Sequence, residues 1–337
     1  MKSLVCEQPG KFKWKNTDPP KPKKQEALVN IKRIGICGTD LHAFKGNQPF
    51  FQYPRILGHE LAGVIESIED NPFDLKQGDQ VSVIPYIECG ECIACRNGKT
   101  NCCTQMKVLG VHIDGGMCEQ VSVPYDHLIK TERLSLDQTA VIEPLSIGAH
   151  AVRRTNIKKD ECVLVIGSGP IGLGVMAFAK IEGAKVIAMD INTERLKFCR
   201  DWADVDYIVN ALDSPSESLE QITNGDMPTV VFDATGNSTS MTDAFHYPAN
   251  GGKLIYVGLV KEDITFSNPA FHSKELTLMA SRNATKSDFE YVVQSIRKNK
   301  IIVSEYITNR SGFNQTIEHF EEWLKPETNV IKAMVEL

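Results

Sequence analysis

The sequence lacks the features that mark membrane-spanning, exported and nucleic-acid-binding proteins. No apolar run approaches the ~20 residues that span a bilayer, and the first residues, Met1–Cys6, lack the apolar core of a signal peptide. Net charge is −6 and no basic run extends beyond Lys21–Lys24, so nothing marks a nucleic-acid surface. Repeats and low-complexity segments are also absent. We therefore expect a cytoplasmic protein that acts on a small molecule, with no nucleic-acid or membrane partner.

Composition and length indicate a globular protein with more than one core. The 42% hydrophobic and 24% charged residues are typical of a soluble chain. With 337 residues and roughly 150 residues per domain, two domains are expected. The ten cysteines, in a chain without an export signal, favour metal ligation over disulfides.

Four cysteines lie at close spacing in the pattern Cys89-x2-Cys92-x2-Cys95-x7-Cys103. Four thiolates wrapped around one tetrahedral ion are typical of a structural zinc site. The main alternative is an iron–sulfur cluster, whose usual bacterial pattern is C-x2-C-x2-C-x3-C-P. Here the last gap is longer and no proline follows Cys103, which favours zinc. Cys102 competes with Cys103 for the fourth position.

A second candidate metal site has mixed ligands. Cys37 offers a thiolate, His59 an imidazole and Glu60 a carboxylate, and a catalytic zinc uses three such ligands while leaving one position open. The alternative is that Cys37 is a small buried residue and His59 a packed loop histidine. Glu143, on a helix expected over Gln138–Arg154, either faces solvent or projects into the site as a ligand or a partner of its water.

A nucleotide-binding pattern begins after the apolar strand expected at Cys162–Ile166. Gly167, Gly169 and Gly172 form G-x-G-x-x-G between a strand and a helix, and Asp190 ends the next strand. A pyrophosphate would lie at the helix N-terminus, and Asp190 would accept hydrogen bonds from a ribose 2′-OH and repel a 2′-phosphate. This pattern predicts NAD in preference to NADP. The remaining expected contacts are Pro170 and Ile171 in the loop, and Thr235, Gly236, Val257, Gly258 and Leu259 after later strands.

The arrangement of expected elements predicts an α/β protein with two different bodies. Short strands without helical periodicity before residue 130 indicate a β-barrel-like body. From residue 162 on, strands alternate with helices, which indicates a doubly wound parallel sheet with its ligand at the carboxyl ends of the strands.

Taken together, these motifs resemble those of the zinc-containing medium-chain alcohol dehydrogenase family. The resemblance rests on Cys37-Gly38-Thr39-Asp40-x-His42, Gly58-His59-Glu60, the four cysteines, Glu143-Pro144-Leu145 and the Gly167–Gly172 loop, in the family's order. It implies a GroES-like catalytic domain over 1–147, a Rossmann domain over 148–283 and a return to the catalytic domain over 284–337. Glu143 in place of a third sulfur or imidazole ligand is similar to the polyol and threonine dehydrogenase branch.

More narrowly, four segments are similar to bacterial sugar-acid dehydrogenases of the L-galactonate 5-dehydrogenase type: Gly46–Phe51, Val108–Gly116, His150–Arg154 and Ser281–Thr285. This resemblance implies hydride transfer from a secondary hydroxyl of a sugar acid or polyol to NAD, in a cleft between the domains. Thr39 and His42 resemble the family's proton relay, and Glu60 is expected to exchange with Glu143 on the metal.

The substrate carboxylate needs a cationic partner, and arginine binds carboxylates in a bidentate manner. Arg282 is the first candidate, with Arg55, Arg153 and Arg154 as alternatives. Phe50 and Asn283 are also expected to line the substrate site.

Two further alternatives remain, an L-threonine or sorbitol-like polyol dehydrogenase and a nucleotide-sensing protein of the same fold. An open zinc site argues against the sensor, which has no need of one. We expect a homo-oligomer, either a dimer or a tetramer.

Overall fold

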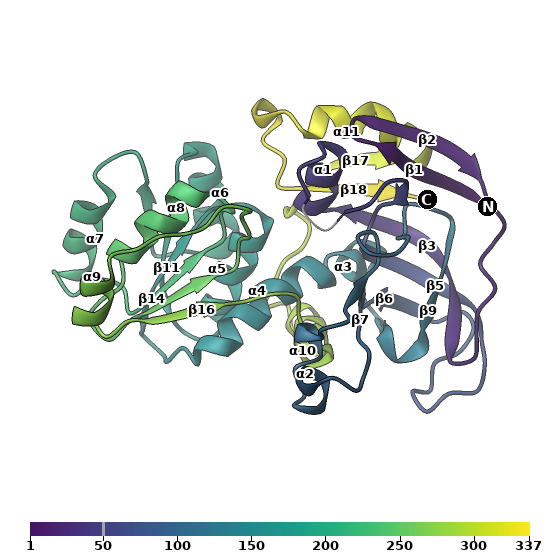
Figure 1. Ribbon diagram of the computed structural model, residues 1–337, viewed down its shortest axis with the longest axis horizontal. Helices are drawn as coiled ribbons and strands as arrows, with labels where there is room; N and C mark the ends of the chain where they lie inside the picture. Colours follow the sequence, from purple (N-terminus) through teal and green to yellow (C-terminus); the bar gives the residue numbers. More distant parts are fainter. Residues whose placement is uncertain (49–50) are drawn as a thin grey trace. The chain divides into compact units, whose positions relative to one another are not determined.

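The computed structural model describes residues 1–48 and 51–337, which form two compact units (Figure 1). Unit 1 comprises Met1–Pro144 and Thr285–Leu337, and unit 2 comprises Leu145–Ala284. Within the described residues, no helix is both long enough and apolar enough to cross a membrane.

Unit 1 is built on a seven-stranded sheet in which β3 is central. The strands run in the order β10-β6-β5-β3-β18-β17, and β9 also pairs with β3. A second sheet has the order β2-β1-β4, and β7 pairs with β8. The bounds are β1 Lys2–Gln8, β2 Lys11–Asn16, β3 Glu26–Ile36, β4 Arg55–Ile56, β5 Glu60–Ile68, β6 Gln80–Val83, β7 Tyr86–Ile87, β8 Lys107–Val108, β9 Gln120–Pro124, β10 Leu128–Lys130, β17 Ile307–Gly312 and β18 Lys332–Glu336.

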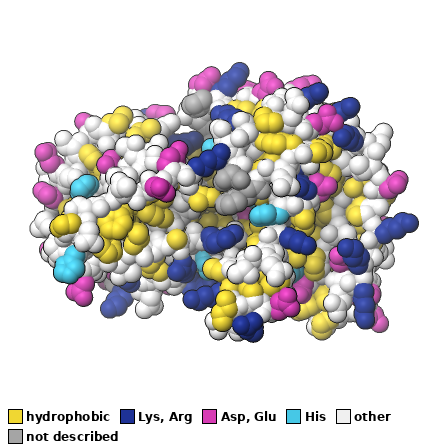
Figure 2. Space-filling view, in the orientation of Figure 1, with side chains coloured by type: hydrophobic (Ala, Val, Ile, Leu, Met, Phe, Trp, Pro, Cys, Tyr) yellow, Lys and Arg dark blue, Asp and Glu magenta, His cyan; other side chains and the backbone are white. Residues whose placement is uncertain are grey.

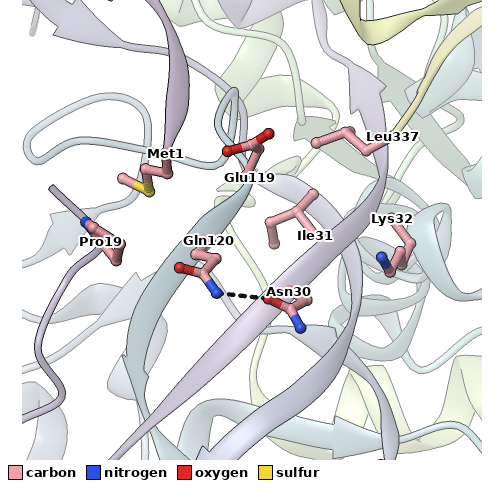
Figure 3. A pocket seen from close by; sticks show the side chains of 8 residues that line it. All are labelled: Met1, Pro19, Asn30, Ile31, Lys32, Glu119, Gln120 and Leu337. Atoms are coloured by element: carbon pink, nitrogen blue, oxygen red, sulfur yellow. Dashed lines mark hydrogen bonds between the residues drawn. The ribbon is translucent and has the colours of Figure 1, made fainter. Parts of the chain in front are cut away.

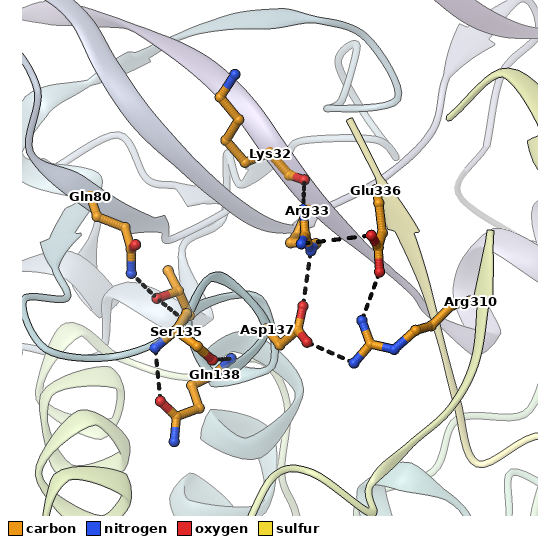
Figure 4. A network of polar contacts seen from close by, with 9 residues as sticks. Lys32, Arg33, Gln80, Ser135, Asp137, Gln138, Arg310 and Glu336 are labelled. Carbon is orange, nitrogen blue, oxygen red and sulfur yellow. Dashed lines mark hydrogen bonds and ion pairs between the residues drawn. The ribbon is translucent and has the colours of Figure 1, made fainter. Parts of the chain in front are cut away.

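The C-terminal strands complete the N-terminal sheet. β18 pairs antiparallel with β3 and parallel with β17, and an ion-pair network joins these strands to a helix (Figure 4). Asp137 accepts from Arg33 at 2.9 Å and from Arg310 at 2.6 Å, and Arg310 also binds Glu336 at 2.8 Å. The last strand, β18, therefore lies inside the sheet between β3 and β17, and its Lys332 is buried.

The helix expected over Gln138–Arg154 is in fact two helices. These are α3 (Leu136–Ala140) and α4 (Ile142–Thr155). Pro144 explains the break, because a helical proline cannot donate to the carbonyl four residues earlier, here that of Ala140, and its ring clashes with it. As a result Glu143 lies in the first turn of α4 instead of mid-helix. The other helices of unit 1 are α1 Gly38–Phe44, α2 Ile93–Arg96, α10 Lys286–Arg297 and α11 Thr316–Trp323.

Unit 2 is a six-stranded, wholly parallel sheet in the order β13-β12-β11-β14-β15-β16. Strands and helices alternate along the chain, as the sequence predicts. The strands are β11 Cys162–Ile166, β12 Lys185–Asp190, β13 Tyr207–Asn210, β14 Val230–Asp233, β15 Lys253–Tyr256 and β16 Thr277–Ala280, and the helices are α5 Pro170–Ile181, α6 Thr193–Ala203, α7 Pro215–Thr223, α8 Ser238–Asp243 and α9 Asn268–Ser273.

Each unit has its own hydrophobic core, made of the inward-facing residues of its sheet. In unit 1 the core includes Val29, Ile34 and Leu61, and in unit 2 it includes Leu164 and Val231. The predicted fold class, a mainly β body with an inserted doubly wound α/β domain, is confirmed.

Candidate metal and nucleotide sites

Cys37, His59 and Glu60 come together although Cys37 is more than twenty residues from the others. Their ligand atoms all lie within 4.8 Å of one another. Cys37 follows β3, and His59 and Glu60 stand at the start of β5, which pairs with β3 through Gly35 and Glu60. The turn before His59 requires Gly58, which has φ +91°, and a Cβ on the facing Gly115 would lie 2.3 Å from the Gly58 carbonyl oxygen.

Asp40 ties the two parts of this site together, and sequence analysis gave it no role. Its Oδ2 accepts from the Cys37 backbone N–H at 3.0 Å and its Oδ1 from the Gly58 N–H at 3.1 Å. The same Oδ1 is 3.6 Å from His59 Nδ1, which makes no hydrogen bond to the described residues. A carboxylate behind the second ring nitrogen is the usual support of a metal-binding histidine. The signal was its place three residues after Cys37, the capping-box spacing.

Glu60 is paired with a buried lysine that sequence analysis also missed. Lys332 Nζ donates to both oxygens of Glu60, at 2.6 and 2.8 Å, and to the Ile36 carbonyl oxygen at 3.1 Å. Lys332 and Glu60 are 1% and 0% exposed. Burial alone would lower the pKa of Lys332, but the Glu60 carboxylate outweighs it and holds that pKa above its ordinary value.

Glu143 is not among the residues whose ligand atoms all lie within 4.8 Å of one another, but it is close enough to His59 and Glu60 to interact electrostatically with both. It is 3% exposed, and burial, with the Glu60 charge, raises the pKa of Glu143 to about 7. The Tyr86 hydroxyl donates a short hydrogen bond to its Oε1. Tyr86 itself is buried, so burial first and the Glu143 charge second raise its pKa well above the usual range.

The charges of this cluster fit a divalent cation. Four groups that become anionic on ionisation lie around His59, and Lys332 pairs directly with only one of them, Glu60; the others are Cys37, Asp40 and Glu143. Buried charges persist when they are paired or bind metals. A dication would neutralise two of the remaining three groups, and Asp40 is further stabilised by the backbone N–H groups of Cys37 and Gly58. The thiolate, imidazole and carboxylate set suits zinc.

The four predicted cysteine ligands lie in the segment 89–103, which we call the four-cysteine lobe, and they also come together. Cys89, Cys92, Cys95 and Cys103 have sulfur atoms within 4.8 Å of one another, and the pairs Cys92–Cys95 and Cys89–Cys103 are each 3.5 Å apart. Four sulfurs bound tetrahedrally at about 2.3 Å from one ion would be about 3.8 Å apart, so the cluster is nearly closed around a zinc-sized space. Cys102 is exposed and lies outside this group.

The expected relay residues lie on α1, directly after Cys37. Thr39 is half-buried and His42 is exposed at the surface. Phe50, expected at the substrate site, lies outside the described residues.

In unit 2 the glycine-rich loop joins β11 to α5. Gly169 is the N-cap of α5 and Pro170 its first residue, followed by Ile171, so free N–H groups of the first turn face the loop. A Cβ at Gly172 would meet the Gly167 carbonyl oxygen at 1.7 Å. That loop geometry therefore depends on glycine and leaves the helix N-terminus open to an anion.

Asp190 ends β12 and supports this loop. Its Oδ2 accepts from the Ser168 N–H at 2.6 Å and its Oδ1 from the Asn192 N–H at 2.9 Å. The sequence assigned Asp190 to a ribose, and the structure adds this role in the loop. The carboxylate is half-buried.

The other predicted nucleotide contacts lie at the carboxyl ends of neighbouring strands. Thr235 and Gly236 follow β14, and the Thr235 hydroxyl donates to buried Asp233 at 2.7 Å. Val257, Gly258 and Leu259 follow β15, and the first two donate backbone N–H groups to the Asp233 carbonyl oxygen. After β16 come Arg282, which is exposed, and Asn283, which has φ +51°.

The surface shows two further features of the described residues. A cavity of about 530 Å³, lined by Met1, Pro19, Glu119 and Leu337 among others, contains none of the predicted site residues (Figure 3). On the face shown in Figure 2, acidic and basic side chains are interspersed.

Comparison with known proteins gives consistent matches along the chain. A model described as "Alcohol dehydrogenase GroES-like domain" matches residues 23–133, and one described as "Zinc-binding dehydrogenase" matches residues 170–298. L-galactonate-5-dehydrogenase of Escherichia coli K12 is 42% identical, covering 99% of this chain and 98% of that protein. L-idonate 5-dehydrogenase of Vitis vinifera is 33% identical, covering 93% and 88%. The RspB alcohol dehydrogenase of Escherichia coli CFT073, solved with NADH, superimposes with a TM-score of 0.93 at 29% identity, covering 100% and 99%.

Proposed function

The chain belongs to the zinc-binding alcohol dehydrogenase family, and from that premise we propose that it oxidises a secondary hydroxyl of a sugar acid with NAD⁺. The observation that carries this proposal is the mixed site in unit 1, where Cys37, His59 and Glu60 are brought together beside Glu143. Such a ligand set leaves a position for substrate, unlike the four-sulfur lobe. In the reaction the carbinol carbon loses a hydride, the hydroxyl loses a proton, and a ketone is formed.

When bound, zinc acts as a Lewis acid that favours loss of the hydroxyl proton, and NAD⁺ accepts the hydride at its nicotinamide ring. Cys37 and His59 hold the metal, with Glu60 or Glu143 as the third ligand. Glu60 lies with Cys37 and His59 but gives both of its oxygens to Lys332, which would favour Glu143 as the third ligand of the resting site. The proton leaves through Thr39 and then His42, whose exposed ring passes it to water.

NAD is the proposed cofactor because Asp190 presents a carboxylate where a 2′-phosphate would stand in NADP. The glycine-rich loop of Gly167, Gly169 and Gly172 holds the pyrophosphate at the α5 N-terminus. The NADH-bound relative with the same fold supports this choice.

The proposed substrate is an aldonate such as L-galactonate, oxidised at a secondary hydroxyl remote from its carboxylate. The relatives named for L-galactonate and L-idonate support this substrate class. Arg282, an exposed guanidinium after β16, is the proposed anchor of the substrate carboxylate, with Asn283 beside the sugar chain.

The test is a panel of aldonates and neutral polyols, assayed for NADH formation at 340 nm with wild type, Arg282→Met and Arg200→Met. Arg200 is an exposed arginine in α6 of the same unit and serves as the charge control. Loss of a hydrogen-bonded partner of a charged group costs about 1.5–3 kcal/mol, or roughly one to two decades in kcat/KM. The kcat/KM of Arg282→Met should fall by this factor with aldonates but not with neutral polyols, and the kcat/KM of Arg200→Met should be unchanged with both.

A wild-type enzyme that turned over threonine or sorbitol and ignored every aldonate would contradict the substrate class. If aldonates are turned over but Arg282→Met loses little kcat/KM, the proposed substrate class stands and the assignment of Arg282 as its anchor is wrong. Binding of NAD without any turnover would favour the nucleotide-sensing alternative.

We further propose a homo-oligomer, a dimer or a tetramer, in the cytoplasm. The edge strand β16 supports the first point, because its Leu278 is 40% exposed and unpaired apolar edges are pairing sites. The ten cysteines, none of which forms a disulfide, support the second point. Light scattering of the purified protein measures the assembly, and a monomer would contradict it.

A further inference from the structure

The short strand β7 connects the four-cysteine lobe to the mixed metal site within unit 1. Its first residue, Tyr86, is 5% exposed and donates its hydroxyl to Glu143. Three residues later the chain reaches Cys89, the first sulfur of the lobe. A segment of four residues therefore carries both a ligand of the four-cysteine lobe and the hydrogen-bond partner of a candidate ligand at the mixed site.

The backbone of β7 is held from several sides. It pairs with β8 through Tyr86–Val108 and Ile87–Lys107. His127 Nε2 lies 3.2 Å from the Tyr86 carbonyl oxygen and 2.9 Å from Glu88 Oε2, while its Nδ1 lies 2.8 Å from Asp126. At the lobe, the Cys89 N–H donates to Cys103 Sγ at 3.3 Å.

The ring of Tyr86 is held as well, edge-on to Phe289 with centroids 6.3 Å apart. A tyrosine fixed at both backbone and ring places its hydroxyl at one point, which is what a positioning group requires.

The two buried carboxylates of the site are supported differently. Glu60 gives both of its oxygens to Lys332, whereas Tyr86 engages Glu143 through Oε1. A carboxylate has two oxygens that accept independently, so the hydrogen bond from Tyr86 to Oε1 does not occupy Oε2 of Glu143.

We propose that Tyr86 is a positioning residue that fixes Oε1 of Glu143 and thereby presents Oε2 to the metal held by Cys37 and His59. This inference rests on the proposed function, because it assigns a support to one ligand of the proposed zinc. The lobe contributes by anchoring β7. Loss of such an outer partner typically costs 10–100-fold in metal affinity.

The experiment compares zinc-loaded wild type, Tyr86→Phe and Tyr247→Phe by titration with a chromogenic chelator, together with thermal melting. Tyr86→Phe removes only the hydroxyl. Tyr247 is a buried tyrosine of unit 2, 8% exposed, and is the matched control. We expect wild type and the control to release two zinc ions per chain in two steps. In Tyr86→Phe one step should move to a roughly 10–100-fold lower chelator concentration. The other step should be unchanged, and the melting temperature should fall by no more than the few degrees that loss of one buried hydrogen bond costs.

Two results would overturn this inference and leave the proposed function standing. In the first, wild type holds two zinc ions and Tyr86→Phe releases both at the same chelator concentrations as wild type. In the second, both release steps of Tyr86→Phe move to lower chelator concentration and its melting temperature falls strongly, which marks a general structural role. A wild type that holds only the lobe zinc overturns the proposed metal centre and this inference with it.

Discussion

Replacing Lys332 by methionine should strongly destabilise unit 1, because it leaves Glu60 charged and without its cation. Lys332 Nζ contacts both Glu60 oxygens, at 2.6 and 2.8 Å, and the two residues are 1% and 0% exposed. Removing one partner of a buried ion pair costs about 3–5 kcal/mol. For a body of 150–250 residues, at roughly 2–4 °C per kcal/mol, the melting temperature should fall by about 6–20 °C.

The assay is thermal melting of zinc-loaded protein in a double-mutant cycle with Glu60→Gln. Each single variant leaves one buried charge unpaired, but Lys332→Met with Glu60→Gln leaves none, so the double variant should lose much less than the sum. Lys130→Met is the matched control, since Lys130 binds Asp79 and Glu132 at 3.0 Å on the surface, where an ion pair contributes about 0–1 kcal/mol. The reasoning would be refuted if the losses of melting temperature in the two single variants added up in the double variant. It would also be refuted if Lys332→Met lowered the melting temperature no more than Lys130→Met does.

Three further predictions concern pH, cofactor and the lobe. Although burial lowers it, Asp126 and Glu88 raise the pKa of His127 from 6.5 to about 9, so charged His127 stabilises the fold fully below pH 6.5 and loses this contribution as pH rises through about 9. His127→Gln should remove that dependence from melting curves between pH 6 and 10, and an unchanged slope would contradict it. Asp190→Ser should raise the NADP-to-NAD ratio of kcat/KM by roughly 10–100-fold, and a wild type that prefers NADP would contradict the assignment. Cys89→Ser should lower the melting temperature because structural zinc contributes folding energy, whereas Cys37→Ser should abolish turnover and keep the fold; identical behaviour would contradict the division into structural and catalytic sites.

The parts of the fold that follow from local sequence could be predicted. The apolar run at Cys162–Ile166 and the glycines after it specify a strand, a tight turn and a helix N-terminus within one segment. The spacing of the four lobe cysteines likewise restricts them to one small loop. In both cases the interacting groups are neighbours in the chain, so the pattern carries most of the geometry.

The residues that hold the ligands of the mixed metal site in place could not be predicted from local sequence. Lys332 is 272 residues from Glu60 and reaches it only because β18 pairs with β3. Tyr86 lies in a two-residue strand with no periodicity to indicate its direction. The break at Pro144 was in principle visible, since a proline disfavours a continuous helix, but apolar spacing on both sides of it outweighed that signal in the prediction.

The most direct test of the account is the metal content of the purified protein and of Cys37→Ser, measured by elemental analysis. The account predicts two zinc ions per chain in wild type, one in the four-cysteine lobe and one at the mixed site, and one zinc ion in Cys37→Ser. One zinc ion in both proteins, or iron with visible absorption in place of zinc, would contradict it.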